Sequence, residues 1–390
     1  MKILVTAIGR INTQNRDGSE IRFSSVAKVW QKEGNEIHIV LPPREKKILE
    51  AEGLKVKYHL LPEKTTYEGE NLFRILFIYL ARLMKALLFI PPKGMDLIYI
   101  PGDFLIEIIP GFWWKRKCPK ARIVVCLFLV APNPFRGYRY GYQKGWRLPT
   151  TRGLLFFLSQ GVALLLLRKF ADKVFVLNVL DKRLLEKRGL AGKIGVIDMG
   201  VDLSEYLEIK TPSKIYDACF LGRLHPQKGI FELIDIWRLV CQERPKARLA
   251  MVGGGSKEFK ERLKKTIIKE GLSENITFLG FKIGKEKIKI LKQSKVFVLP
   301  SFYESWGMVA VEAMAAGLPV VAYNLPIFPK IFPQGMVSVP IGDRKSFAQA
   351  TLRLLAEEKF YQKMKKQAEE QTRNYDWKKV ATRELKILQV

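Results

Sequence analysis

The stretch KVFVLPSFYESWGMVAVEAMAAGLPVVAY, from Lys295 to Tyr323, predicts how the chain folds. Val296 to Leu299 is an apolar run without alternation, which is typical of a strand buried on both faces of a parallel sheet. Small and apolar residues from Gly307 to Ala316 predict a buried helix, and Gly317 is its stop signal. Strand, loop, helix and strand in this order predict an α/β domain, whose ligands bind at the carboxyl ends of the strands.

Two carboxylates mark this loop-to-helix turn. Glu304 lies in the loop and Glu312 in the predicted helix, with seven residues between them. A carboxylate flanked by apolar residues must find charged or hydrogen-bonding partners, because desolvation is costly. Paired sugar hydroxyls would serve, and so would an arginine or a helix end. For either residue alone the structural role is the simpler interpretation, but two in this frame favour a site.

A second block lies upstream, where Cys219-Phe220-Leu221-Gly222-Arg223 leads into Lys228 and Gly229. The two blocks resemble the G-R-x4-K-G diphosphate clamp and the E-x7-E element of family 4 glycosyltransferases. The resemblance covers roughly residues 215–325, in the family's order and spacing, and is weaker before that.

This resemblance implies a retaining, nucleotide-sugar-dependent hexosyltransferase of the GT-B fold. The fold class is then α/β, with two Rossmann-like doubly wound parallel-sheet domains facing across a cleft. We expect an acceptor-side domain at residues 1–205, a donor-binding domain at 206–370, and a C-terminal helix at 371–390 that crosses back to the first domain. The donor is expected to be a UDP- or GDP-sugar, with no other cofactor. Because no Asp-x-Asp motif is present, no metal is expected.

The resemblance also implies roles for individual residues. Arg223 and Lys228 would bind the diphosphate, Glu304 would position the sugar, and Glu312 would hold the ribose hydroxyls. The other expected donor contacts are Gly18 and Ser19 in the first domain, and Gly222, Gly254, Phe281, Lys282, Trp306, Gly307, Met308 and Val309 in the second. Two surface cations are the simpler interpretation of Arg223 or Lys228 taken alone.

The sequence departs from the family pattern in one place. Many relatives carry a histidine near the end of the strand predicted here at Ile123 to Val130, close to the reacting carbon. This chain has Phe128 at that position. A catalytic part for that side chain is therefore absent. Of the three histidines of the chain, His38 and His59 alternate with apolar neighbours and are interpreted as structural.

Composition and charge limit the classes of function. The 390 residues can form two domains, and 48% hydrophobic residues are enough for large cores. The net charge of +29 favours an anionic partner such as nucleic acid, anionic lipid or a phosphorylated substrate. A lysine-rich thermophile surface would explain part of the excess. The four cysteines have no metal or redox spacing, and Met1 leads directly into a strand-like run, so a reducing cytosol is expected.

The distribution of charge favours a membrane. From Gly111 to Phe170 there are twelve Lys or Arg and no Asp or Glu, interleaved with Trp and Tyr. The same composition could bind single-stranded nucleic acid. However, the apolar run Gly153 to Leu167 follows, which is too short and polar for a confident membrane span but suits a buried or membrane-dipping helix. Leu72 to Ile90 predicts an apolar helix with Arg74, Arg82 and Lys85 on one face, either a solvated stripe or a basic face at a membrane.

We therefore interpret the chain as a transferase that moves a sugar to a lipid-linked or membrane-proximal acceptor in cell-surface glycan or glycolipid assembly. It is expected in the cytoplasm, peripheral on the inner face of the cell membrane, with an anionic membrane surface and no nucleic acid as partners. Two alternatives remain open: a soluble transferase that makes a small glycoside, and a GT-B protein that binds nucleic acid. The sequence does not name the sugar, the nucleotide, the acceptor or the oligomeric state.

Overall fold

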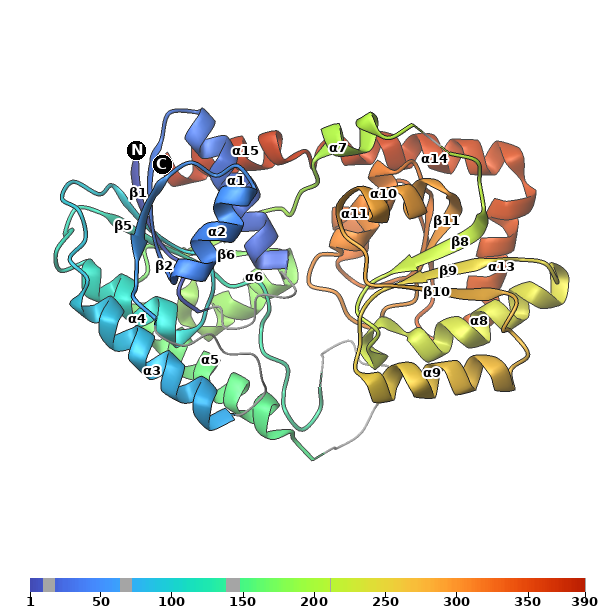
Figure 1. Ribbon diagram of the computed structural model, residues 1–390, viewed down its shortest axis with the longest axis horizontal. Coiled ribbons are helices and arrows are strands. Elements are labelled where there is room, and N and C mark those ends of the chain that lie inside the picture. Colours follow the sequence, from blue (N-terminus) through green and yellow to red (C-terminus); the bar gives the residue numbers. More distant parts are fainter. Residues whose placement is uncertain (10–17, 64–71, 138–147, 211, 390) are drawn as a thin grey trace. The chain divides into compact units, whose positions relative to one another are not determined.

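The computed structural model describes all residues except 10–17, 64–71, 138–147, 211 and 390 (Figure 1). It separates into two compact units. The first unit lies within Met1–Gly137, Trp146–Met199 and Trp377–Val390, and the second within Gly200–Asp376. The tyrosines, cations and tryptophan that the sequence places at 138–147 fall outside the described residues.

The first unit is built on a parallel sheet with the strand order β3-β2-β1-β4-β5-β6-β7. The strands are β1 (Lys2–Thr6), β2 (Glu36–Leu41), β3 (Lys57–Leu60), β4 (Leu97–Ile100), β5 (Arg122–Cys126), β6 (Lys173–Val176) and β7 (Ile194–Val196). The helices are α1 (Gly18–Lys32), α2 (Pro43–Ala51), α3 (Leu72–Leu88), α4 (Leu105–Trp114), α5 (Thr151–Phe170), α6 (Val179–Leu185) with the π-turn η1 (Glu186–Leu190), and α15 (Trp377–Gln389).

The second unit repeats the plan with the order β10-β9-β8-β11-β12-β13, again parallel. Its strands are β8 (Tyr216–Leu221), β9 (Leu249–Val252), β10 (Ile276–Gly280), β11 (Ser294–Leu299), β12 (Val320–Tyr323) and β13 (Met336–Val339). Its helices are α7 (Leu203–Glu208), the 3-10 turn η2 (Pro226–Lys228), α8 (Ile230–Glu243), α9 (Lys257–Lys269), α10 (Gly284–Lys292), α11 (Met308–Ala315), α12 (Phe328–Ile331), α13 (Arg344–Ala356) and α14 (Glu358–Thr372).

Both sheets are doubly wound, as the sequence predicts. In each, the chain winds outward in one direction and then returns to the other side of the first strand, so the winding reverses beside β1 and beside β8. Ligands of such sheets bind outside the carboxyl ends of the strands at this switch point. In the second unit the switch point lies between β8 and β11, the two strands that precede the predicted clamp and carboxylate blocks.

Two details of the first unit correct the sequence predictions. The strand predicted at Ile123 to Val130 ends at Cys126, so Phe128 lies in the following loop. The stripe predicted from Arg74, Arg82 and Lys85 is also wrong, because Arg82 is buried. Its guanidinium donates to both carboxylate oxygens of Glu63 at 3.0 and 2.9 Å and to the carbonyl of Ile8 at 3.1 Å.

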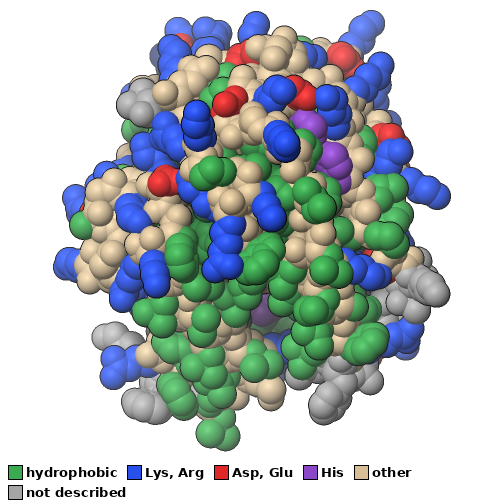
Figure 2. Space-filling view, turned by 90° about the vertical axis from the view of Figure 1, so that its left-hand side faces the viewer, with side chains coloured by type: hydrophobic (Ala, Val, Ile, Leu, Met, Phe, Trp, Pro, Cys, Tyr) green, Lys and Arg blue, Asp and Glu red, His purple; other side chains and the backbone are tan. Residues whose placement is uncertain are grey.

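The side of α3 that faces solvent is apolar instead. Large hydrophobic side chains of α3 and α5 are more than 40% exposed, and Figure 2 shows hydrophobic side chains gathered on one face of the molecule with Lys and Arg around them. We call this set the α3–α5 face; its members are Leu76, Phe77, Leu80, Met84 and Leu88 on α3, and Leu155, Leu158, Val162 and Leu165 on α5. Both helices pack against α4 on their other side.

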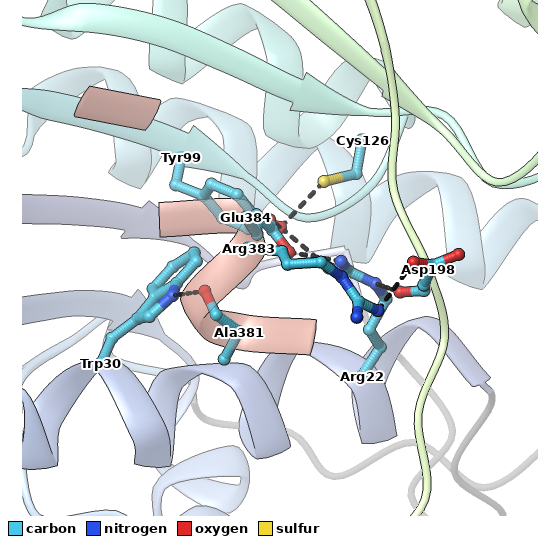
Figure 3. A network of polar contacts seen from close by, with 8 residues as sticks. All are labelled: Arg22, Trp30, Tyr99, Cys126, Asp198, Ala381, Arg383 and Glu384. Atoms are coloured by element: carbon cyan, nitrogen blue, oxygen red, sulfur yellow. Dashed lines mark hydrogen bonds and ion pairs between the residues drawn. The ribbon is translucent and has the colours of Figure 1, made fainter. Parts of the chain in front are cut away.

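The C-terminal helix α15 belongs to the first unit and packs on α1. Its Glu384 is fully buried and forms an ion pair with the equally buried Arg22 of α1 (Figure 3). The second carboxylate oxygen of Glu384 accepts from the Tyr99 hydroxyl at 2.9 Å, and Trp30 donates to the carbonyl of Ala381 at 3.2 Å. These contacts fix the last helix to the sheet through β4 and α1.

Candidate functional site

The clamp block and the first carboxylate meet at the switch point of the second sheet. Lys228, at the end of η2, follows β8, and Glu304 follows β11. The Lys228 Nζ lies 2.6 Å from Oε1 of Glu304, and the two side chains are 13% and 8% exposed. Residues 76 positions apart in sequence therefore form one mostly buried ion pair at the carboxyl edge of the sheet.

The backbone brings these two loops together. Gly229 has φ +65, and a Cβ there would lie 1.9 Å from the carbonyl oxygen of Pro300, so only glycine fits. Phe302 donates its backbone N–H to the Gln227 carbonyl at 2.9 Å, and the Gln227 side chain donates to the Tyr303 carbonyl at 3.1 Å. The glycine of the clamp motif is thus a packing requirement that holds Lys228 against the carboxylate loop.

His225 caps the same turn. Its Nδ1 accepts from the backbone N–H of Gln227 at 3.2 Å. Burial and the neighbouring charges of Arg223 and Lys228 lower the pKa of His225, which keeps the ring neutral and able to accept. The Arg223 guanidinium itself is exposed and, among the described residues, has no ion-pair partner. It is therefore available to an anionic ligand.

The second carboxylate has a lysine of its own. Glu312 Oε1 lies 2.9 Å from Nζ of Lys287, which comes from α10, and the side chains are 13% and 22% exposed. Burial, with the negative charge of Glu312 nearby, raises the pKa of Tyr206 well above its ordinary value. Lys287 was not predicted, because α10 and its flanks hold several lysines and sequence alone does not separate this one from those at 282, 285, 289 and 292.

The start of α11 offers unpaired backbone donors. Gly307 is the residue before the helix, has φ +103, and supplies no side-chain cap. The first amides of a helix have no partner within it and carry a partial positive charge, so Met308 and Val309 suit an anion. The Trp306 ring is buried and packs edge-on against Phe332 and Tyr375, which leaves only its backbone for a ligand.

The remaining predicted residues fall into two groups. Gly222 and Gly254 follow β8 and β9, and Gly254 accepts from the backbone of Leu224 at 2.8 Å. Phe281 is 54% exposed beside Gly254, and Lys282 pairs with Glu286 at 3.3 Å. Gly18 and Ser19 begin α1 in the first unit, so their approach to a donor, and the predicted cleft between the sheets, stay predictions.

In the first unit, Phe128 lies in the loop after β5, at the position where the sequence departs from the family pattern. The Phe128 ring lies 5.5 Å from the guanidinium carbon of Arg22 and covers it. Nearby, Gln160 of α5 donates to Asp103 at 2.6 Å and to the Leu129 carbonyl at 2.9 Å. Among the described residues no three His, Cys, Asp or Glu side chains gather as metal ligands.

The second unit matches a known protein family, and part of the chain matches curated relatives. Residues 207–371 match the family model described as "Glycosyl transferases group 1". The phosphatidyl-myo-inositol mannosyltransferase of Mycobacterium leprae is 35% identical over 172 residues, which are 43% of this chain and 45% of that protein. The chain thus spans less than half the length of this relative.

Solved structures resemble the whole chain. Sucrose-phosphate synthase from Thermosynechococcus elongatus has a TM-score of 0.73 at 19% identity, and covers 100% of this chain and 98% of its own. Anabaena Alr3699/HepE in complex with UDP and glucose has a TM-score of 0.72 at 18% identity, with 100% and 99% covered. Residues 207–371 of the second unit thus match the group 1 glycosyl transferases, the family that the sequence resembles, and the fold of the chain is GT-B.

Proposed function

We propose that this protein is a retaining glycosyltransferase that transfers a sugar from a UDP- or GDP-sugar to a lipid-linked or membrane-proximal acceptor. It would work in the cytoplasm at the inner face of the membrane, in cell-surface glycan or glycolipid assembly. The observation that carries this proposal is the Lys228–Glu304 ion pair beside the exposed Arg223 and the open start of α11. Cations, helix amides and a carboxylate meet at one sheet edge.

The chemistry follows from the charges of these groups. Transfer breaks the bond between the anomeric carbon and the phosphate oxygen, and negative charge grows on the leaving diphosphate. Arg223, Lys228 and the amides of Met308 and Val309 would stabilise that charge. The acceptor oxygen bonds to the same face of the sugar, and its proton passes to the leaving phosphate. No residue of the protein needs to act as a covalent nucleophile in this route.

The two carboxylates, Glu304 and Glu312, would bind the uncharged hydroxyl groups of the donor. Without a donor, Glu304 holds Lys228, so an arriving diphosphate competes for this lysine. When Lys228 turns to the phosphate, Glu304 becomes free to accept from sugar hydroxyls. Lys287 occupies only Oε1 of Glu312. The other carboxylate oxygen of Glu312, Oε2, would then accept from the ribose hydroxyls.

The acceptor class rests on the first unit. Its exposed apolar helices with cations around them suit a lipid surface better than a small water-soluble acceptor. The Mycobacterium leprae relative is itself named for a lipid, phosphatidyl-myo-inositol. UDP, which accompanies HepE, is the first nucleotide to test, with GDP beside it.

A thermal-shift screen of UDP-, GDP- and ADP-sugars tests the donor site. We expect one nucleotide class to raise the unfolding temperature of the wild type, because a ligand that binds only the folded state stabilises it by mass action. Glu312→Ala should lose the shift, while Glu261→Ala, an exposed position on α9, should keep it. No shift with any donor, or an equal shift in Glu312→Ala, would contradict the assignment.

A further inference from the structure

We propose that the α3–α5 face inserts into the acyl-chain boundary of an anionic bilayer and holds the first unit to the membrane by apolar contact. The proposal rests on the proposed function only in its purpose, which is to bring the enzyme to a lipid acceptor. The sequence interpretation already combined cations, interfacial Trp and Tyr, and a buried or membrane-dipping helix at 153–167. The proposal goes beyond it by assigning the membrane contact to named exposed side chains of α3 and α5.

The pattern of exposure is regular. On α3 the residues Leu76, Leu80, Met84 and Leu88 recur every four positions, and on α5 the residues at 155, 158, 162 and 165 alternate by three and four. Such spacing puts each set on one side of its helix. Phe77 is 71% exposed, Leu88 78% and Leu165 61%. Contiguous exposed apolar surface of this kind marks an interaction site.

Helix α5 is fixed to the unit along its length and lies on its surface. It is the one described helix long and apolar enough to cross a membrane, and 22% of its apolar window is buried. However, Gln160 at its middle donates to Asp103 and Leu129 and accepts from the backbone of Ala131 at 2.7 Å. Leu164 and Leu167 lie in the core. A crossing orientation would break all of these contacts, so the helix suits a position in the membrane plane.

Helix α3 directs its polar groups toward the protein. Arg82 is buried against Glu63, the ammonium of Lys85 bonds the carbonyl of Pro62, and the Tyr79 hydroxyl donates to the Gly9 carbonyl at 2.9 Å. The helix contains no acidic residue. Two of its three cations are thus used on the protein side. What remains outward over most of the helix is hydrocarbon.

Charge identifies the occupant as an anionic bilayer. Arg152 lies in the first turn of α5, and Arg168 and Lys169 lie in its last turn. Trp113, near the end of α4, is 42% exposed, and the Arg116 guanidinium lies 4.5 Å from its ring. Long cations at helix ends and an interfacial tryptophan suit lipid head groups above the acyl chains. A second copy of this chain is disfavoured, because the protein carries +29 and two such faces would repel.

Flotation of the full-length protein with vesicles tests the proposal. We would compare phosphatidylcholine vesicles with phosphatidylcholine–phosphatidylglycerol vesicles, each at 0.1 and 0.5 M salt. The test variant is the triple substitution Phe77→Asn, Leu158→Asn, Leu165→Asn. The matched control is Leu207→Asn with Ile268→Asn, which removes exposed apolar side chains of the second unit, 84% and 67% exposed.

We expect the wild type and the control to float with anionic vesicles and to keep a measurable fraction bound at 0.5 M salt, where surface charges are screened. The triple variant should lose at least tenfold in vesicle partitioning. If 0.5 M salt abolishes vesicle binding and the triple variant still binds at 0.1 M salt, the proposal is overturned in favour of binding by cations alone. A wild-type dimer in size-exclusion chromatography that the triple variant loses, without flotation, would overturn it in favour of self-association.

The donor-induced thermal shift separates this proposal from the proposed function. If the triple variant keeps the shift and its unfolding temperature but no longer floats, the membrane face is lost while the folded donor site is intact. If the wild type floats but no nucleotide sugar shifts it, the docking surface stands and the transferase proposal fails.

Discussion

Lys228 and Glu304 form an ion pair in the absence of a donor. Substitution of Lys228 tests whether its ammonium stabilises the charge on the leaving phosphate. Lys228→Met removes the ammonium that would meet the leaving phosphate, and we expect kcat/KM to fall by about 10²-fold or more. Lys228→Arg should recover only part, because a planar fork does not replace a point charge against a single carboxylate oxygen. Initial rates with the donor found by the thermal-shift screen measure both; values within twofold of wild type would contradict the role.

Lys287 is expected to act through Glu312. Lys287→Met leaves a mostly buried carboxylate without the ammonium that holds it in place, so its hold on the ribose hydroxyls weakens. We expect nucleotide affinity to fall about tenfold, and the preference for ribo- over 2′-deoxyribonucleotide to shrink, with Lys287→Arg close to wild type. Calorimetric titration of both nucleotides gives the ratio. The control is Lys285→Met, which removes an 83% exposed lysine of the same helix. An unchanged ratio in Lys287→Met would leave Lys287 a structural role only.

At the scale of single residues, the sequence identifies the candidate site residues better than it identifies the side chains that contact them. Glu304, Glu312 and Lys228 stand out because their spacing resembles a family motif, and the structure brings Lys228 and Glu304 into contact. Lys287 has no such signal, since its importance comes from where α10 lies beside α11. Arg82 shows the same limit. Its helical position is on the predicted face, but its guanidinium turns inward to Glu63, a partner 19 positions away.

The contact of α15 with the first unit depends on one buried ion pair. Glu384→Ala leaves the Arg22 guanidinium charged without its carboxylate in the core (Figure 3). Removing one partner of a buried pair costs about 3 to 5 kcal/mol of unfolding free energy. Urea unfolding of this variant beside Glu370→Ala, an exposed carboxylate of α14, measures the difference. A loss below about 1 kcal/mol would mean that α15 is held mainly by apolar packing.

The contact between Asp103 and α5 makes the stability of the first unit depend on pH. Burial raises the pKa of Asp103 from its ordinary 3.8 to about 6, although the bond from Gln160 opposes the rise. The folded state binds the Asp103 proton more tightly than the unfolded state does. The stabilisation that this proton gives the folded state is therefore full below pH 4 and is lost as pH rises through about 6. A pKa shift of about two units corresponds to about 3 kcal/mol of unfolding free energy. Partial exposure of the Asp103 side chain reduces this to about 2 kcal/mol.

Asp103→Asn tests this sign, since its side-chain oxygen can still accept from Gln160 but does not titrate. The unfolding free energy of the wild type minus that of the variant should fall by about 2 kcal/mol between pH 4 and pH 7. Urea unfolding at four pH values in this window gives the difference. A flat or rising difference would show that Asp103 is fully solvated or paired with a cation.

At the scale of the whole molecule, the sequence predicts the two sheets but not every element. Apolar runs such as Val296 to Leu299 identify buried parallel strands, and the alternation with helices gives their class. Helix α4 was not predicted, because Pro110 and Gly111 lie inside it and disfavour helix by propensity. Tertiary packing outweighs that preference, since Trp114 of this helix is buried and donates to the Ala86 carbonyl at 2.8 Å.

Separate cores predict separate unfolding. One buried cluster lies entirely within the first unit and another entirely within the second, and α15 adds its contacts to the first. Calorimetry should therefore resolve two transitions. A nucleotide at a hundredfold excess over its Kd stabilises its unit by about 2.7 kcal/mol, which corresponds to roughly 5 to 10 °C. Because Arg223, Lys228 and Glu312 lie in the second unit, only that transition should rise. Glu384→Ala should lower only the other. A single transition that nucleotide and substitution both move would mean that the units unfold as one.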